Sequence, residues 1–523
     1  MPRVSTILIA VAFTAGLILR LVSLSGVPPS LYCDEAFQGY EAYSLLQTGA
    51  DSHGRPWPLF FDIFGVGWEE PLYIYLTMIP VALLGTTPAA TRVVAAVAGA
   101  LAILAVAWLA TRLAGRWAGA AAALSMAFSP WAFHFSRVGF QASLLPLFLA
   151  AGMAALLEGV RSRDALLAEA APASPPRAGW VALGLFLLVA ALYTYVASRA
   201  IVPLLLAAFG MIYLPSLRRL RVSRKVLLAL ALLVPALPLV LFASSAAGME
   251  RFQDVGLLSR VHGAGAVLAF LRNYLTYFSP SFLLTHGDPN LRHSAAGYGM
   301  LLPHDLVLLL AGLLVALIRR RSPDLLLCWW LLVAPLGAAL TADPSHAVRA
   351  IGMLPAIHAL AGSGAAAIFG AGSPLSPRRR RGAIILALFL GSALVSAGLY
   401  LHHYFFRYPV YSAPAWQYGL EQAYEKIEAR AGEHDSIYVT RAEDFPWIQR
   451  LYLFAFPPAE YQQYGFSKTH YLFDEPVFYR GGLIPGRSHP IFLLKPGELE
   501  ASGLPAREII RNPDGTPAFV IAW

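Results

Sequence analysis

Long apolar stretches recur through the first 400 residues, separated by short polar or basic segments. A helix needs about 20 mostly apolar residues to cross a hydrocarbon core about 30 Å thick. Eleven stretches approach this length, the shortest being 200–214 and 304–318. The pattern predicts an α-helical multi-pass membrane protein with spans at residues 4–24, 91–112, 115–135, 140–158, 179–197, 200–214, 226–244, 304–318, 325–341, 350–371 and 383–402.

One further apolar stretch, residues 71–85, is short and contains Pro80. Counting it as a span would reverse the side of every later loop. We therefore expect a helix lying in the membrane interface. Three long segments then fall on one side of the membrane: 25–90, with two interfacial helices, 245–303, and the end of the chain.

The last part of the chain, residues 403–523, has a different pattern. Residues 415–431 have the apolar spacing of a helix after Pro414. Four short runs are typical of strands: 436–440, 450–455, 490–494 and 517–523. The chain is therefore expected to contain a membrane domain, 1–402, and a small α/β domain, 403–523.

The composition agrees with a membrane location. Hydrophobic residues make up 57% of the chain and charged residues only 13%, whereas soluble proteins contain about 25% charged residues. The mean hydropathy is +0.59. Cys33 and Cys328 lie far apart, which argues against a disulfide framework or a thiolate metal site.

The net charge of +9 comes from basic clusters in the short loops between spans. With alternating spans, every cluster falls on one side, and the positive-inside rule makes that side cytoplasmic. The N-terminus is then cytoplasmic, with its first helix a retained anchor, and the C-terminal domain is extracytoplasmic. This distribution indicates a bilayer as partner and gives no reason to expect nucleic-acid binding. The clusters lie at Arg112/Arg116, Arg161/Arg163/Arg177, Arg218 to Lys225, Arg319 to Arg321 and Arg378 to Arg381.

Candidate chemistry lies at the outer interface, because no span carries Asp, Glu or Lys near its centre. Asp34 and Glu35 open a predicted helix that runs to Thr48. Taken alone, Asp34 is more simply an N-cap and Glu35 a complement to the helix dipole. A second acidic pair, Glu69 and Glu70, precedes the next predicted helix.

At these residues the sequence resembles membrane glycosyltransferases of the GT-C fold. It is most similar to the branch of the protein O-mannosyltransferases and aminoarabinose transferases, a family 39-like group. The shared features are the first-loop acid, the E-x-P helix start, the Arg-rich inner loops and the outer tail. The resemblance spans about residues 4–402. It implies a polyprenyl-phosphate-linked sugar as donor and a hydroxyl acceptor on protein, lipid or glycan. It also implies inverting transfer at the outer face, with Asp34 as catalytic carboxylate. Aminoarabinose relatives often have Lys, a phosphate ligand, where this chain has Glu70.

The leaving phosphate then needs cationic partners at the same depth. Each outer cation has a simpler interpretation as an anchor at the membrane interface. His346 and Arg349 form the best pair, because residues three apart at the start of a span share a helical face. The candidates are Arg137, Arg199, Arg292, His293, His346 and Arg349, with Asp288 beside the middle two.

We expect no cofactor and metal-independent transfer. Metal-dependent oligosaccharyltransferases of this fold carry further acids on the second outer loop, whereas residues 129–145 contain no carboxylate. Two other functions remain open. An envelope polysaccharide ligase or polymerase would depend on outer Arg and His residues, and a lipid-linked-sugar transporter would need polar sites within its spans.

Overall fold

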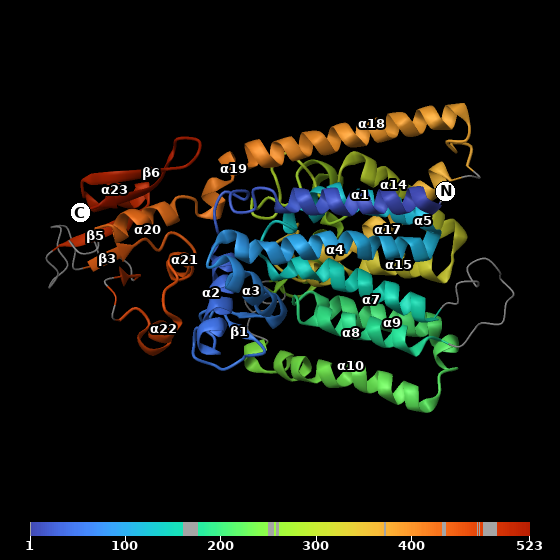
Figure 1. Cartoon of the computed structure of the whole chain (residues 1–523), viewed down its shortest axis with the longest axis horizontal. Coiled ribbons are helices and arrows are strands. Elements are labelled where there is room, and N and C mark those ends of the chain that lie inside the picture. Colours follow the sequence, from blue (N-terminus) through green and yellow to red (C-terminus); the bar gives the residue numbers. More distant parts are fainter. Residues whose placement is uncertain are drawn as a thin grey trace.

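Helices make up most of the computed structural model, which describes residues 2–160, 176–248, 256–257, 261–370, 373–430, 436–467, 469, 471–473 and 489–523. Each predicted span coincides with a helix or with two consecutive helices (Figure 1). Within the described residues, eight helical stretches are long and apolar enough to cross a membrane. The bundle contains α1 (Pro2–Leu21), α4 (Pro88–Ala114), α5 (Arg116–Phe128), α7 (Leu145–Val160), α8 (Ala178–Leu192), α9 (Ser198–Leu217), α10 (Val222–Ala243), α14 (Pro303–Arg319), α15 (Ser322–Val333), α17 (Leu354–Phe369) and α18 (Arg380–His402).

Two predicted spans are broken by proline. The range 115–135 divides at Pro130 into α5 and α6 (Pro130–Phe135), and Ser129 before it is extended with ψ 128°. The range 325–341 divides at Pro335 into α15 and α16 (Leu336–Ala339). Proline has no N–H to donate and disfavours helical backbone at the preceding residue, which explains the break at Pro130.

Glycines let the central helices approach closely. A Cβ on Gly362 of α17 would lie 2.3 Å from the carbonyl oxygen of Ala118 in α5. A Cβ on Gly312 of α14 would lie 2.0 Å from that of Leu360 in α17. Such small residues are typical of packed transmembrane helices. The outer helices differ: in α10, only 6% of the residues in its most apolar 18-residue stretch are buried.

The two ends of the bundle differ in what they carry (Figure 1). The turns α4–α5, α9–α10 and α14–α15, which hold basic clusters, lie at the end nearest the N-terminus. The opposite end carries α2 (Cys33–Thr48), α3 (Pro71–Leu84) and the ribbon of β1 (Phe61–Asp62) and β2 (Trp68–Glu69). It also carries the final part of the chain. The prediction that the basic loops share one side therefore agrees with this arrangement.

The segment between α10 and α14 is partly described. It contains α13 (Ala264–Thr276) and the π-helical turn η2 (Ser281–Thr285). Of the basic cluster Arg161/Arg163/Arg177, Arg161 and Arg163 lie outside the described part of the chain.

The C-terminal region contains a five-stranded sheet in the order β4-β3-β5-β7-β6. Strands β3, β4 and β5 are parallel to one another, and β7 is antiparallel to β5 and β6. Their bounds are β3 (Ser436–Val439), β4 (Tyr471–Leu472), β5 (Pro490–Leu494), β6 (Ala506–Arg511) and β7 (Pro517–Ala522). Three of the four predicted strands are confirmed.

The fourth, 450–455, is wrong: these residues belong mostly to helix α21 (Pro446–Leu453), with α22 (Pro458–Tyr464) following. The buried residues Ile448, Leu451 and Tyr452 have the i, i+3, i+4 spacing of a helix face. This helix packs against α2, where a Cβ on Gly39 would lie 2.5 Å from the Tyr452 ring. The helix predicted at 415–431 is shorter, consisting of the 3-10 turn η5 (Ala413–Trp416) and α20 (Leu420–Glu428), and α23 (Pro496–Ser502) was not predicted.

Candidate functional site

A cavity of about 480 Å³ opens where α2, the β2–α3 junction and two loops of the chain converge. The loops are residues 288–293, after η2, and 343–349, before the 3-10 turn η3 (Ile351–Met353). The cavity brings together six of the ten residues selected from the sequence: Asp34, Glu69, Arg292, His293, His346 and Arg349.

Asp34 is the exposed residue in the first turn of α2. Its neighbours Cys33 and Glu35 are buried, whereas Asp34 is exposed and lines the cavity. The interpretation of Asp34 as N-cap is wrong, because Tyr32 occupies that position with extended backbone. Glu35 performs the capping instead, accepting a hydrogen bond of 3.1 Å from the Tyr32 N–H.

Glu35 is enclosed by protein rather than facing the cavity. Its carboxylate forms an ion pair with Arg92 of α4 at 2.8 Å, and both side chains are fully buried. It also accepts a hydrogen bond of 2.8 Å from the Gly139 N–H. These contacts join the first loop to α4 and to the segment after α6. Glu35 therefore has a structural role and does not face the cavity.

The second acidic pair separates in the same way. Glu69 lines the cavity, whereas Glu70 pairs with Arg199 at 2.8 Å. Successive residues of an extended segment point to opposite sides, and both lie in extended backbone before α3. Neither Glu70 nor Arg199 lines the cavity.

Arg137 also lies outside the cavity lining. Its guanidinium is buried and donates hydrogen bonds to five backbone carbonyl groups at and beyond the end of α1: Leu19, Arg20, Val22, Ser23 and Val27. Carbonyl groups past a helix C-terminus have no helical partner, and Arg137 satisfies them. We therefore leave Arg137 and Arg199 out of the proposed phosphate-binding set.

His346 and Arg349 line the cavity, but the helical face inferred for them is wrong. The segment from 342 to 350 consists of bends and turns, and helical structure begins only at Ile351. The left-handed backbone of Ser345, with φ 63°, interrupts helical structure just before His346. The loop is held by the Ala347 N–H, which donates to Asp288 Oδ2 at 2.7 Å.

Arg292 and His293 are positioned by a turn built on side chains. Asp288 Oδ1 accepts from the Asn290 N–H at 2.8 Å, and Asn290 Oδ1 accepts from the Arg292 N–H at 3.0 Å. Such local bonds are the ordinary role of Asp and Asn in turns. The Arg292 guanidinium lies 4.0 Å from the Tyr32 ring centroid, a cation–π contact.

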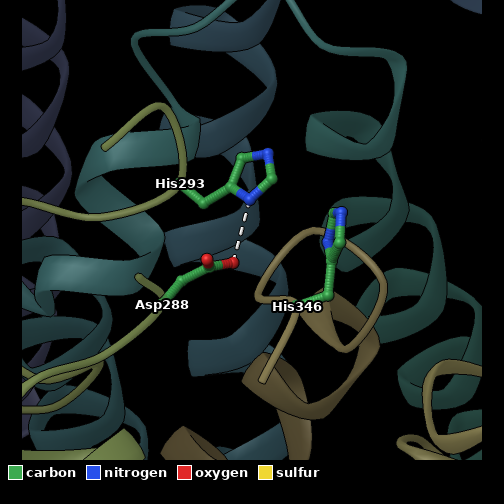
Figure 2. Close-up of side chains that lie close together, drawn as sticks. All are labelled: Asp288, His293 and His346. Atoms are coloured by element: carbon green, nitrogen blue, oxygen red, sulfur yellow. Dashed lines mark hydrogen bonds and ion pairs between the residues drawn. The ribbon is translucent and has the colours of Figure 1, made fainter. Parts of the chain in front are cut away.

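Asp288, His293 and His346 form a possible metal-binding cluster (Figure 2). Their ligand atoms all lie within 4.8 Å of one another. His293 Nδ1 and Asp288 Oδ2 are 2.9 Å apart, and His346 approaches from the other loop. Two imidazoles and a carboxylate are a donor set that zinc accepts. None of these three residues lies within 129–145, the loop whose lack of carboxylates led us to expect metal-independent transfer; they come from two later loops of the chain.

Several cavity residues were not predicted. Gln38 lies one turn after Asp34 on α2, and Gln141 belongs to the 3-10 turn η1 (Gln141–Leu144). Tyr32 and Asp343 also line the cavity. For Gln38 the i, i+4 spacing from Asp34 was an available signal. Nothing in the sequence distinguished Gln141 from other polar residues near helix ends.

The C-terminal region forms part of the cavity surroundings. Tyr32 donates its hydroxyl to Asp444 Oδ2 at 2.8 Å, and Gln449 Nε2 donates to the Leu31 carbonyl at 2.7 Å. Burial raises the pKa of Tyr32, so this hydroxyl stays protonated and acts as a donor. The two contacts fix the chain immediately before Asp34 from residues more than 400 positions away.

No protein-family model matches the chain, and no curated protein matches it in sequence. Among solved structures, it is similar to ArnT from Cupriavidus metallidurans bound to undecaprenyl phosphate. The TM-score is 0.59 at 16% identity, over 99% of this chain and 97% of that one. AglB, the oligosaccharyltransferase of Archaeoglobus fulgidus, in complex with an inhibitory peptide and a dolichol-phosphate, gives a TM-score of 0.51 at 15% identity. That match covers 85% of this chain and 63% of AglB.

Proposed function

Because the chain has the GT-C fold of membrane glycosyltransferases, as the sequence predicted, we propose that it transfers a monosaccharide from a polyprenyl-phosphate carrier. The acceptor is a hydroxyl group of a protein, lipid or glycan. The similar structures of ArnT and AglB hold undecaprenyl phosphate and dolichol-phosphate, respectively. These ligands support a prenyl phosphate as the leaving group here.

The exposed Asp34 carboxylate in a cavity lined by two arginines is the observation on which this proposal rests. In the reaction, Asp34 accepts the proton of the acceptor hydroxyl. The hydroxyl oxygen then forms a bond to the anomeric carbon as the bond from that carbon to the phosphate oxygen breaks. A single displacement of this kind inverts the configuration. The prenyl phosphate leaves with the electron pair of the broken bond.

Arg292 and Arg349 stabilise the phosphate as its charge increases. Both line the cavity from the two loops that face α2. Arg349 also lies 3.3 Å from Asp343, whose side chain is exposed. An exposed ion pair contributes little energy, so a phosphate can compete for this guanidinium. Fixed cations placed where charge develops are among the strongest contributions to catalysis. No step of this mechanism uses a metal ion.

The membrane orientation follows from the same proposal. Helix α2 and the β2–α3 junction, which line the cavity, lie with the C-terminal sheet at the end of the bundle opposite the basic turns (Figure 1). With those turns in the cytoplasm, the cavity faces the extracytoplasmic side, and residues 403–523 form an outer domain beside it. A lipid-linked donor in the outer leaflet then reaches the cavity from the membrane.

The experiment is the substitution Asp34→Asn, assayed for transfer from a radiolabelled polyprenyl-phosphate sugar to membrane or envelope acceptors. General-base catalysis contributes about 10²–10⁴-fold, so we expect a loss of that order. Binding of the donor and the unfolding temperature are expected to stay close to wild type. Near-normal transfer would contradict the proposal and favour the envelope ligase, which needs no carboxylate. Carrier-linked sugar moving across liposome membranes without transfer would favour the transporter.

A further inference from the structure

We propose that two glutamine amides, Gln38 and Gln141, form a subsite for the hydroxyl groups of an uncharged sugar. The inference rests on the proposed function, because it places the sugar of the same lipid-linked donor. The two amides line a part of the cavity to which neither the reaction step nor phosphate binding gives a role.

The cavity has two walls of different character. One consists of the loops 288–293 and 343–349, which carry Arg292, Arg349 and the two histidines. These loops are joined, since the His293 and His346 ring centroids are 4.5 Å apart. The other wall consists of α2, the β2–α3 junction and η1, which contribute the two amides along with Asp34 and Glu69. The first wall also carries the carboxylates of Asp288 and Asp343. Its two arginines suit the phosphate, which leaves the other wall, where the described residues include no cation, for the sugar.

The orientation of the Gln141 amide is fixed by the backbone. Its Oε1 accepts a hydrogen bond of 3.1 Å from the Glu70 N–H. The other end of the amide is therefore the NH₂ group. Within the described residues this group has no hydrogen-bond partner, and protein atoms do not enclose it. Because Gln141 lines the cavity, its NH₂ group is a donor available to a ligand.

Gln38 offers a second amide. The residue is only 1% exposed and lines the cavity. Its Oε1 is enclosed by protein and lacks a hydrogen-bond partner among the described residues. Its NH₂ group has no hydrogen-bond partner among those residues either, but protein atoms do not enclose it, so this is the end of the amide that a ligand reaches. Buried polar groups are nearly always paired, so an unpaired amide at a cavity wall indicates a partner brought by a ligand. A hydroxyl oxygen supplies the missing acceptor.

The chemistry of the two groups identifies the ligand class. A sugar carries several hydroxyl groups, whose oxygens accept hydrogen bonds from the NH₂ groups of both amides. Gln38 lies four residues after Asp34, on the same face of α2 and about 6 Å further along the axis. The carboxylate and the amide are thus one helical turn apart, so a sugar whose anomeric carbon lies near Asp34 reaches Gln38 with another part of its ring.

The test measures how much the sugar adds to binding of the lipid carrier. The full-length protein is placed in nanodiscs. Its affinity is measured for undecaprenyl phosphate alone, for undecaprenyl-phosphate glucose and for undecaprenyl-phosphate mannose. The variant Gln38→Met has nearly the same volume but no amide. We expect the wild type to bind at least one sugar-bearing lipid roughly tenfold more tightly than bare undecaprenyl phosphate. Gln38→Met should lose most of this increment and keep its affinity for the bare lipid.

Two controls separate the subsite from general damage. Arg349→Ala should weaken binding of all three lipids, because it removes a phosphate contact. The matched substitution Gln463→Met, at an exposed position of α22, should change none of the affinities. If Gln38→Met does not fold, Gln38→Asn keeps an amide but shortens it, and the same loss of the sugar increment is expected.

The outcomes distinguish this inference from the function on which it rests. If the increment is absent in the wild type, or persists in the Gln38 variants, the subsite is wrong, whatever the activity. If Asp34→Asn abolishes transfer at the same time, the proposed function survives without the subsite. If Asp34→Asn transfers normally, the function is overturned independently of the binding data.

Discussion

Glu35 and Asp34 are adjacent carboxylates for which the structure predicts opposite consequences of the same substitution. Glu35→Gln removes the negative charge that faces Arg92. The two side chains are fully buried, and Nε and Nη2 of Arg92 each donate a hydrogen bond of 2.8 Å to the Glu35 carboxylate. Arg92 keeps its bonds to the carbonyls of Leu24 and Pro28, but its charge remains buried without a counter-ion.

The expected cost follows from this geometry. Removing one member of a buried, hydrogen-bonded ion pair destabilises a protein by about 3–5 kcal/mol. The new amide also presents an NH₂ group toward donors such as the Gly139 N–H, which is a second unfavourable contact. The three carbonyl contacts of Arg92, which include Ser30, offset part of the loss. We therefore expect a loss of about 3 kcal/mol.

The assay is unfolding in detergent micelles, followed by tryptophan fluorescence during heating and during titration with denaturant. Asp34→Asn is the matched control, because its side chain is exposed and surface substitutions usually change stability by no more than about 0.5 kcal/mol. If Glu35→Gln unfolds like the wild type and loses transfer as Asp34→Asn does, then Glu35 acts in catalysis and its structural role is wrong.

Two further predictions concern pH and metal. Burial raises the pKa of Glu41 to about 8, although the Ser52 N–H and hydroxyl donate to its carboxylate. Because the folded pKa lies above the ordinary value of 4.5, this group favours the folded state below about pH 4.5, and the contribution is lost as the pH rises toward 8. Glu41→Gln should therefore flatten the fall in unfolding temperature between about pH 5 and about pH 8, and an unchanged slope would count against this assignment. For the cluster of Asp288, His293 and His346, we expect transfer to survive dialysis against EDTA; stoichiometric zinc that disappears in His346→Ala, together with chelator-sensitive activity, would refute metal-independent transfer.

The sequence predicted those features that depend on local composition. The length of the apolar stretches placed the helices, and the acids flanking the first outer helices pointed to Asp34 and Glu69. The strand predicted at 450–455 failed because a short apolar run fits both periods, and its helical form is stabilised by packing on α2. The position of Arg349 at the same end of the bundle as Asp34 was likewise readable. Its loop conformation depends on the left-handed Ser345 and on the hydrogen bond that the Ala347 N–H donates to the distant Asp288.

Other properties of the site depend on long-range contacts that spacing does not encode. Arg137 and Arg349 look equivalent in the sequence, since each is an arginine near the outer end of an apolar stretch. In the fold, carbonyl groups from the end of α1 occupy the Arg137 guanidinium, and Arg349 faces the cavity. Asp34 and Glu35 differ for the same reason: the helix turns one toward the cavity and the other toward Arg92.

The hydrogen bonds that Tyr32 donates to Asp444 and that Gln449 donates to Leu31 have a consequence for biosynthesis. The ribosome makes the residues around Asp34 within the first tenth of the polypeptide, yet their supports emerge only after α18 has been synthesised. A nascent chain can therefore insert most of its helices before Tyr32 and Leu31 have their hydrogen-bond partners from the C-terminal region. The site is complete only once α21 has been synthesised and has packed against α2. The protein therefore becomes active only when most of the chain has been translated.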